Sequence, residues 1–153
     1  MEAQSPFSHI LVPTDGSENS VRAGQLAAQI ASMHGAQMTL VYVVDDIIVD
    51  EIASATLKST ETIGRELESK GQRYLDYLAR LAQDRDIPCE QVIRRGIPHS
   101  EIANLARERM VDLIVIGRVG RRGPRGLLGS VAERVIEYAH CPVLVVSQNP
   151  ARY

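Results

Sequence analysis

Short apolar runs, separated by stretches with helical spacing, constrain the fold of this chain more than any other feature of its sequence. The clearest run is VDLIVIG at residues 111–117, and further strand-like runs lie at 9–13, 38–44, 89–95 and 143–147. A continuous apolar run is typical of a strand that is covered on both faces, as strands in a parallel sheet are. The sequence therefore predicts five strands.

The stretches between these runs carry apolar residues at the spacing of a helix. Four helices are expected: one between caps at Ser17 and Gly35, one from Leu67 to Pro88, one that His99 or Ser100 caps, and one from Ser130 to His140. In the last helix, Val131, Val135 and Tyr138 should point inward. The segment from Asp45 to about Gly64 shows no decisive pattern.

Strands that alternate with helices predict one α/β domain over residues 1–153. We expect an open five-stranded parallel sheet with helices on both faces, joined by right-handed crossovers. Such sheets bind ligands beyond the carboxyl ends of their strands, where the strand order reverses. Two loops are candidates for this site: PTDGS after the first strand and GRVGRRGPRGLLGS after the fourth.

The net charge and the lengths of the apolar runs argue against some classes of binding partner. The formal net charge is only −2, which predicts neither a nucleic-acid nor a membrane partner for the chain as a whole. No apolar run approaches the roughly 18 residues of a membrane span, so we expect a cytoplasmic protein. Two cysteines, Cys89 and Cys141, are too few for a metal cluster and are expected to be buried as small hydrophobic residues.

A glycine stands at every third position from Gly117 to Gly129. The stretch is too short for a collagen helix, whereas a flexible linker stays possible. However, a strand is expected to end at Gly117 and a helix to begin at Ser130. Amides of a glycine loop and of a first helical turn can bind phosphate, and Ser130 can cap the helix and offer its hydroxyl. Arginines 118, 121, 122 and 125 add positive charge. The pattern favours a phosphate site.

Motifs of other nucleotide and hydrolase classes are missing. The sequence contains no G-x-x-x-x-G-K-[ST], no G-x-G-x-x-G after a strand and no G-x-S-x-G, which argues against a Walker NTPase, a dinucleotide-binding domain and an esterase. Asp15, at the end of the first strand, can accept hydrogen bonds from two sugar hydroxyls. It can also close an Asx turn before the helix, and both roles stay open.

Four segments, HILVPTDGSENS, TLVYVVDD, DLIVIGRVG and LLGSVAERVIEYAHCPVLVV, together resemble the ATP-binding branch of the universal stress protein family. The resemblance implies a Rossmann-like fold of the adenine nucleotide alpha hydrolase-like kind. It also implies that ATP, ADP or AMP is bound, with any Mg²⁺ carried by the phosphates. The family signature is G-x2-G-x9-G followed by serine, threonine or asparagine. Here eight residues separate Gly120 from Gly129-Ser130.

The resemblance also assigns site residues. Asp15 is expected to hold the ribose and the backbone of Val43 to read the adenine edge. The phosphates are expected to lie among Ile116, Gly117, Gly120, Gly129, Ser130 and Val131, and Pro13, Thr14 and Arg118 complete the expected site. A homodimer joined through the last strand, residues 143–147, is implied as well, and an exposed apolar edge strand also favours it.

Three functions fit these observations. The first is an ATP-binding stress-response regulator that shows a different surface to a protein partner when nucleotide is bound, with at most slow hydrolysis because the loop offers no general base. The second is a dimeric interaction module with a vestigial nucleotide site. The third and weakest is a small hydrolase or transferase, with residues 45–65 as a mobile lid and Asp45, Asp46 and Asp50 as metal ligands, although such acids are more often solvated helix caps.

Overall fold

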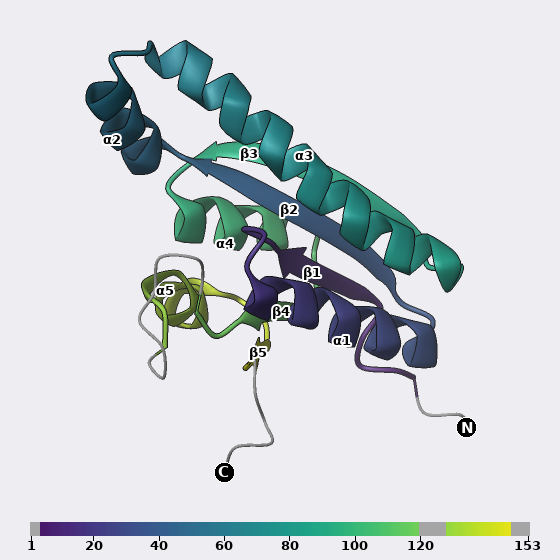
Figure 1. Ribbon diagram of the computed structural model, residues 1–153. Coiled ribbons are helices and arrows are strands. Elements are labelled where there is room, and N and C mark those ends of the chain that lie inside the picture. The colour runs from purple at the N-terminus through teal and green to yellow at the C-terminus, as the bar shows by residue number, and fades with distance from the viewer. Residues whose placement is uncertain (1–3, 120–127, 148–153) are drawn as a thin grey trace.

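Five parallel strands form the sheet at the centre of the computed structural model, which describes residues 4–119 and 128–147 (Figure 1). The strands are β1 (His9–Pro13), β2 (Gln37–Asp45), β3 (Cys89–Gly96), β4 (Leu113–Gly117) and β5 (Val143–Val146). The helices are α1 (Glu18–His34), α2 (Asp46–Thr56), α3 (Thr60–Asp84), α4 (Pro98–Glu108) and α5 (Ser130–Tyr138).

The strand order is β3-β2-β1-β4-β5, and every neighbouring pair is parallel. The chain moves outward from β1 to β2 and β3, and then returns to the other side of β1 for β4 and β5. Because right-handed crossovers that run in opposite directions place their helices on opposite faces, α1 and α3 cover one face while α4 and α5 cover the other. The predicted α/β class, parallel sheet and two-sided helix cover are confirmed.

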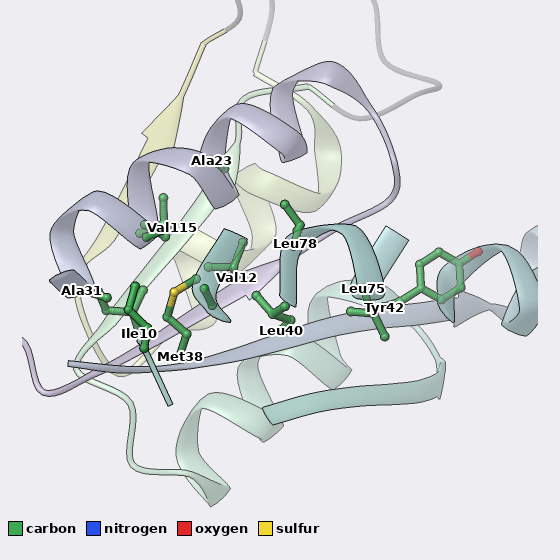
Figure 2. Packing of buried hydrophobic residues seen from close by; sticks show 14 of the residues in the cluster. Ile10, Val12, Ala23, Ala31, Met38, Leu40, Tyr42, Leu75, Leu78 and Val115 are labelled. Atoms are coloured by element: carbon green, nitrogen blue, oxygen red, sulfur yellow. The ribbon is translucent and has the colours of Figure 1, made fainter. Parts of the chain in front are cut away.

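Alternating side chains of the inner strands build the core on the two faces. Ile10 and Val12 of β1 pack with α1 and α3, whereas Leu11 between them packs with α4 and α5. Figure 2 shows the first of these clusters, in which Leu75 and Leu78 of α3 lie over β2. The two-sided burial explains why these strands read as unbroken apolar runs in the sequence.

The prediction of four helices is wrong, because the described residues form five. The ambiguous segment 45–64 holds all of α2 and the first turn of α3. Asp45 caps α2 by accepting a hydrogen bond from the amide of Ile47, and Ser59 caps α3 by accepting one from the amide of Thr62. Within residues 45–64 both helices bury few apolar side chains, so the helical spacing of apolar residues is weak in this part of the sequence.

Helix caps were predicted with mixed success. Ser17 caps α1 through its side chain, and Gly35 ends it in the left-handed conformation with φ +65°, as expected. At α4 the prediction is wrong: the helix begins at Pro98, no side chain caps it, and neither His99 nor Ser100 has that role. Proline fits the first turn because its φ is preset and its missing N–H would have no partner there.

The last helix differs from the sequence prediction in two ways. It ends at Tyr138, two residues before His140, and Gly129 rather than Ser130 occupies the N-cap position. Val135 is buried as expected, but Val131 and Tyr138 are 37% and 47% exposed, so they do not point into the core of this chain. Helix α5 therefore keeps an apolar face that its own sheet does not cover.

The cysteines are free but are not both buried. Cys89, at the start of the edge strand β3, is exposed, and Cys141 is half-buried. The expectation of two buried cysteines is therefore wrong for Cys89, because β3 has a strand on one side only. Neighbouring atoms still desolvate its sulfur, and together with the negative charge of Glu90 this raises the pKa of the Cys89 thiol to about 11.

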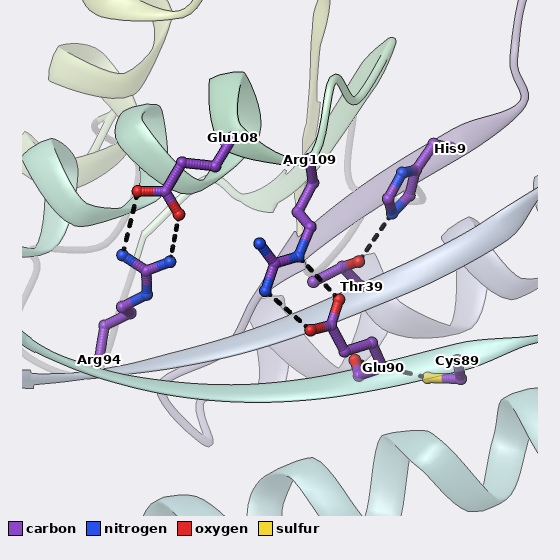
Figure 3. A network of polar contacts seen from close by, with 7 residues as sticks. All are labelled: His9, Thr39, Cys89, Glu90, Arg94, Glu108 and Arg109. Atoms are coloured by element: carbon purple, nitrogen blue, oxygen red, sulfur yellow. Dashed lines mark hydrogen bonds and ion pairs between the residues drawn. The ribbon is translucent and has the colours of Figure 1, made fainter.

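A polar network ties α4 to the sheet at the end opposite the carboxyl ends of the strands (Figure 3). Arg109 donates two hydrogen bonds to the Glu90 carboxylate, Nε to Oε2 at 3.0 Å and Nη2 to Oε1 at 2.9 Å. Close by, His9 Nε2 and Thr39 Oγ1 share a hydrogen bond of 2.7 Å inside the sheet layer. The Arg109 hydrogen bonds are the main reason that the pKa of Glu90 lies below its usual range.

We expect the stabilisation from this pair to depend on pH. Because the pKa of Glu90 is lowered in the folded chain, the contribution is present above the ordinary glutamate pKa and is lost as pH falls through the lowered value. Arg109→Ala should therefore lower the free energy of unfolding at about pH 7, and its difference from the wild type should be smaller at an acid pH below the lowered pKa of Glu90. Urea unfolding across this range measures the effect.

Arg107→Ala is the matched control, because Arg107 donates to the neutral carbonyl of Tyr138 rather than to a carboxylate. Its difference from the wild type should be the same at both pH values. A pH-independent difference for Arg109→Ala would show that the Glu90 contact contributes nothing.

Candidate functional site

The carboxyl ends of β1 and β4 lie side by side at the point where the strand order reverses. The two strands pair directly, with Ile10 opposite Leu113 and Leu11 opposite Ile114. Both loops singled out from the sequence start here, because residues 14–17 follow β1 and residues 118–129 follow β4. Ligands of open parallel sheets bind at such a reversal.

The turn after β1 is held by a set of short-range hydrogen bonds. The amide of Thr14 donates to the carbonyl of Val41 at 2.9 Å, and Thr14 Oγ1 contacts Ser20 Oγ at 3.0 Å. Asp15 Oδ1 accepts a hydrogen bond of 2.9 Å from the amide of Ser17, which closes the Asx turn that the sequence allowed. This bond holds the Asp15 carboxylate in place at the start of α1.

Gly16 lets an aromatic side chain of α3 cover this turn. Its backbone has φ +79°, a conformation that favours glycine, and a Cβ atom there would overlap the ring of Tyr74. The Tyr74 ring lies 6.1 Å from the ring of Tyr42 on β2. The turn at Asp15 therefore lies between α1, which follows it, and α3, which contributes Tyr74.

The end of β4 packs directly on the first turn of α1. A Cβ atom on Gly117 would lie only 2.8 Å from the carbonyl carbon of Asn19 and 2.9 Å from the amide nitrogen of Ser20. Only glycine allows this approach. The side chain of Asn19 extends the contact, because its Nδ2 donates a hydrogen bond of 2.9 Å to the carbonyl of Val119.

Arg118 joins three segments through its backbone. Its amide donates to the carbonyl of Val146 in β5 at 2.9 Å, and its carbonyl accepts a hydrogen bond of 2.8 Å from the amide of Gly129. The glycine loop therefore leaves β4 and enters α5 at two points that are bonded to each other. This fixes the start of α5 next to the end of β4.

Among the described residues, no side chain caps the N-terminus of α5. Side chains of Ser17, Asp45 and Ser59 cap α1, α2 and α3, whereas Gly129 at the N-cap of α5 supplies no side-chain hydrogen bond. The first amides of a helix have no partner within the helix and carry the positive end of its dipole. An anion at the start of α5 stays a prediction, and the expected capping role of Ser130 is wrong, because Gly129 occupies the N-cap position.

The backbone of Val43 is accessible from the β1 side of the sheet. The register of β1 against β2 ends at Pro13 opposite Val41, and the Val41 carbonyl points toward β1 because it accepts the Thr14 amide. Backbone groups two residues apart in a strand point to the same side, so those of Val43 also face β1, beyond its last paired residue. They can read the edge of a planar ring there.

The predicted site residues that the structure describes gather at the carboxyl edge of the sheet. Pro13, Thr14 and Asp15 follow β1, Val43 lies near the end of β2, Ile116, Gly117 and Arg118 end β4, and Gly129, Ser130 and Val131 begin α5. Gly120 lies outside the described residues. The contacts of Asn19 and Tyr74 with this site are not indicated by the sequence, because both join segments that are far apart in the chain.

The proposed acidic metal site is not formed. Asp45 caps α2 and Asp46 pairs with Arg95 at 3.1 Å, as helix-end acids do. Within residues 4–119 and 128–147, no group of three or more His, Cys, Asp or Glu side chains is placed to hold a metal ion. Among the same residues, no helix combines the length and the apolar character that crossing a membrane requires.

Gly117→Ala should destabilise the fold, because the added methyl group meets backbone atoms of α1 that cannot rotate away. We expect a loss of about 1–3 kcal/mol in the free energy of unfolding, together with faster hydrogen exchange at the amides of Asn19 and Ser20. Urea unfolding and exchange measured by NMR test this. Gly35→Ala strains a left-handed residue in open space, so it should lower stability while leaving those two exchange rates unchanged. Unchanged exchange in Gly117→Ala would contradict the packing.

Comparisons with known proteins agree with this architecture. The model of the universal stress protein family matches residues 6–147. Universal stress protein MJ0531 of Methanocaldococcus jannaschii is 38% identical over 143 residues, which cover 93% of this chain and 83% of that protein.

Solved structures give the same result. The structure of MJ0577, a universal stress protein of M. jannaschii, has a TM-score of 0.81 at 26% identity and covers 94% of this chain and 97% of that one. A universal stress protein in complex with cAMP has a TM-score of 0.66 at 27% identity, with 94% and 99% covered. From the family match and the identity to a relative of similar length, the chain belongs to the universal stress protein family.

Proposed function

We propose that this protein binds an adenine nucleotide, which is ATP, ADP or AMP, between the Asp15 turn and the start of α5. In this proposal it acts in the cytoplasm as a stress-response regulator, and occupancy of the site changes the surface that a protein partner meets. The observation that carries the proposal is the uncapped N-terminus of α5, held beside the end of β4 at the reversal of strand order.

The phosphates fit the start of α5. A phosphate supplies the acceptor oxygens and the negative charge that its first amides and its dipole favour, and Gly129 presents no side chain that would block the approach. The hydroxyl of Ser130, the first residue of the helix, is exposed and can add one hydrogen bond. Any Mg²⁺ would be carried by the phosphates rather than by a carboxylate cluster of this chain.

The nucleoside fits the neighbouring strand ends. The Asx turn orients the Asp15 carboxylate, which can accept hydrogen bonds from ribose hydroxyls, and the backbone of Val43 faces the space beyond β1 where an adenine edge would lie. The related universal stress protein whose structure contains cAMP supports an adenine nucleotide rather than another phosphate ester.

Hydrolysis is expected to be slow at most. Fast phosphoryl transfer needs a positioned water, metal ligands and charge stabilisation at the γ-phosphate. The acid that the structure places at the reversal point is Asp15, and one of its oxygens already accepts the Ser17 amide. A regulator that holds its nucleotide suits this arrangement better than an ATPase.

Calorimetric titration of the nucleotide-free protein with ATP, ADP, AMP and GTP tests the proposal. We expect affinity of about micromolar for adenine nucleotides and weaker binding of GTP. Asp15→Ala should weaken binding about tenfold or more, because the ribose hydroxyls lose a charged acceptor. Gly129→Val should weaken it as well, since φ is −67° at this position and valine adds only bulk in front of the amides.

Asp50→Ala, an exposed acid in α2, is the control and should bind like the wild type. Absence of heat with every nucleotide would remove the regulator proposal and leave the dimeric interaction module with a vestigial site.

We further propose a homodimer through β5, residues 143–147, and both functions are compatible with it. β5 is an edge strand, Leu144 is 37% exposed on it, and the nearby helix α5 exposes Val131, Ile136 and Tyr138 at 37%, 46% and 47%. An apolar edge of this kind is a liability unless a second chain pairs with it.

Leu144→Asp should weaken the dimer by about tenfold or more, because a charge replaces an apolar contact at the edge. Sedimentation velocity over a concentration series measures the dissociation constant. Leu57→Asp, at a residue that follows α2 and is 94% exposed, is the matched control and should leave association unchanged. A wild type that stays monomeric, or a Leu144→Asp dimer of unchanged affinity, would contradict this interface.

A further inference from the structure

Asn19 is an exception within an otherwise satisfied helix start. Ser17, Thr14 and Ser20 bond to one another and to nearby backbone groups. Asn19 uses only half of its amide: Nδ2 donates to the Val119 carbonyl, while Oδ1 is the one side-chain oxygen or nitrogen atom among the described residues that is buried without a hydrogen-bond partner.

The orientation of this amide follows from its partner. A carbonyl oxygen accepts only, so the nitrogen of Asn19 must face Val119 and the oxygen must take the other position. A buried acceptor without a donor costs stability, whereas an apolar residue or alanine would avoid that cost and alanine would suit a helix better. The two ends of the amide therefore act in opposite directions on stability, because Nδ2 satisfies the Val119 carbonyl whereas Oδ1 has no donor.

The contact lies where the candidate site is assembled. Val119 follows Arg118, whose backbone joins β5 to the start of α5, and Asn19 packs against Gly117 at the end of β4. The Asn19 side chain is therefore a bond from α1 to the chain as it leaves β4, on the path that leads to the open N-terminus of α5. Together with the packing of Gly117 on α1, this bond links the β1 side of the site to the β4 side.

We propose that Asn19 is a positioning residue for nucleotide binding, retained at a cost in stability because its bond to Val119 sets the position of the phosphate-binding side relative to the Asp15 turn. This inference rests on the proposed nucleotide site. It concerns the separation of the two sides of that site and assigns no contact between Asn19 and the nucleotide.

The test separates affinity from stability in the full-length protein. Asn19→Ala should bind ATP about tenfold more weakly than the wild type, while its melting temperature without nucleotide stays the same or rises. Asn19→Leu, which keeps a branched side chain of larger volume, should show the same pattern. Asn104→Ala in the exposed face of α4 is the matched control for helix propensity, and its ATP affinity should equal that of the wild type.

Each of the following three outcomes supports or contradicts the positioning role of Asn19. Weaker ATP binding with retained stability in both Asn19 variants supports the positioning role. A lower melting temperature with unchanged ATP affinity assigns Asn19 to structure alone and overturns the inference, while the nucleotide site stands. A wild type that gives no heat with ATP overturns the proposed function, and the inference falls with it.

Discussion

The pairing of β1 on both of its edges is the constraint on which the site depends. Strands β2 and β4 pair with β1 on its two sides. The chain passes from β1 to β2 and β3 on one side and then to β4 and β5 on the other. The loops after β1 and β4, which are far apart in sequence, therefore start at adjacent strand ends. Both helices that follow, α1 and α5, begin at this edge of the sheet, on opposite faces. The strand order alone thus places two helix N-termini at the same edge of the sheet.

The two helices differ in how they use this position. In α1, the Ser17 side chain consumes an amide of the first turn, so the helix is complete in itself. In α5, glycine leaves the corresponding amides open. The difference lies in the N-cap residue, which is a serine with a side-chain acceptor in α1 and a glycine without one in α5.

The strands were predictable because burial on both faces leaves an unbroken apolar run, which few other structures produce. The division of residues 45–64 between two helices was not, because α2 buries only Val49 and Ala53 and Gly64 marks a break in local terms. Gly64 and Gly71 discourage a helix in local terms, but the Arg95 guanidinium and the Tyr42 ring occupy the space where their side chains would be. Contacts across the fold thus reverse the meaning of a residue that the local sequence marks as a breaker.

The site follows the same rule. Asp15, Gly117 and Gly129 could be predicted because short motifs and the positions of strand ends mark them. The bond between Asn19 and Val119 joins residues 100 positions apart, and the open end of α5 is visible only once the N-cap is known to be Gly129. A short sequence pattern identifies residues by their own local position, but it does not identify a side chain that contacts a segment far away in the sequence.

The hydrogen bond between Arg118 and Gly129 has a consequence for how this family can vary in length. It closes the ten residues between them into a ring whose ends are fixed by β4, β5 and α5. The closure entropy of a generic loop varies with the logarithm of its length, which at ten residues is about 0.1 kcal/mol for one residue more or less. A glycine segment one residue shorter than the family signature can therefore leave the first amides of α5 where they are. Selection can adjust the length of the segment without rebuilding the site.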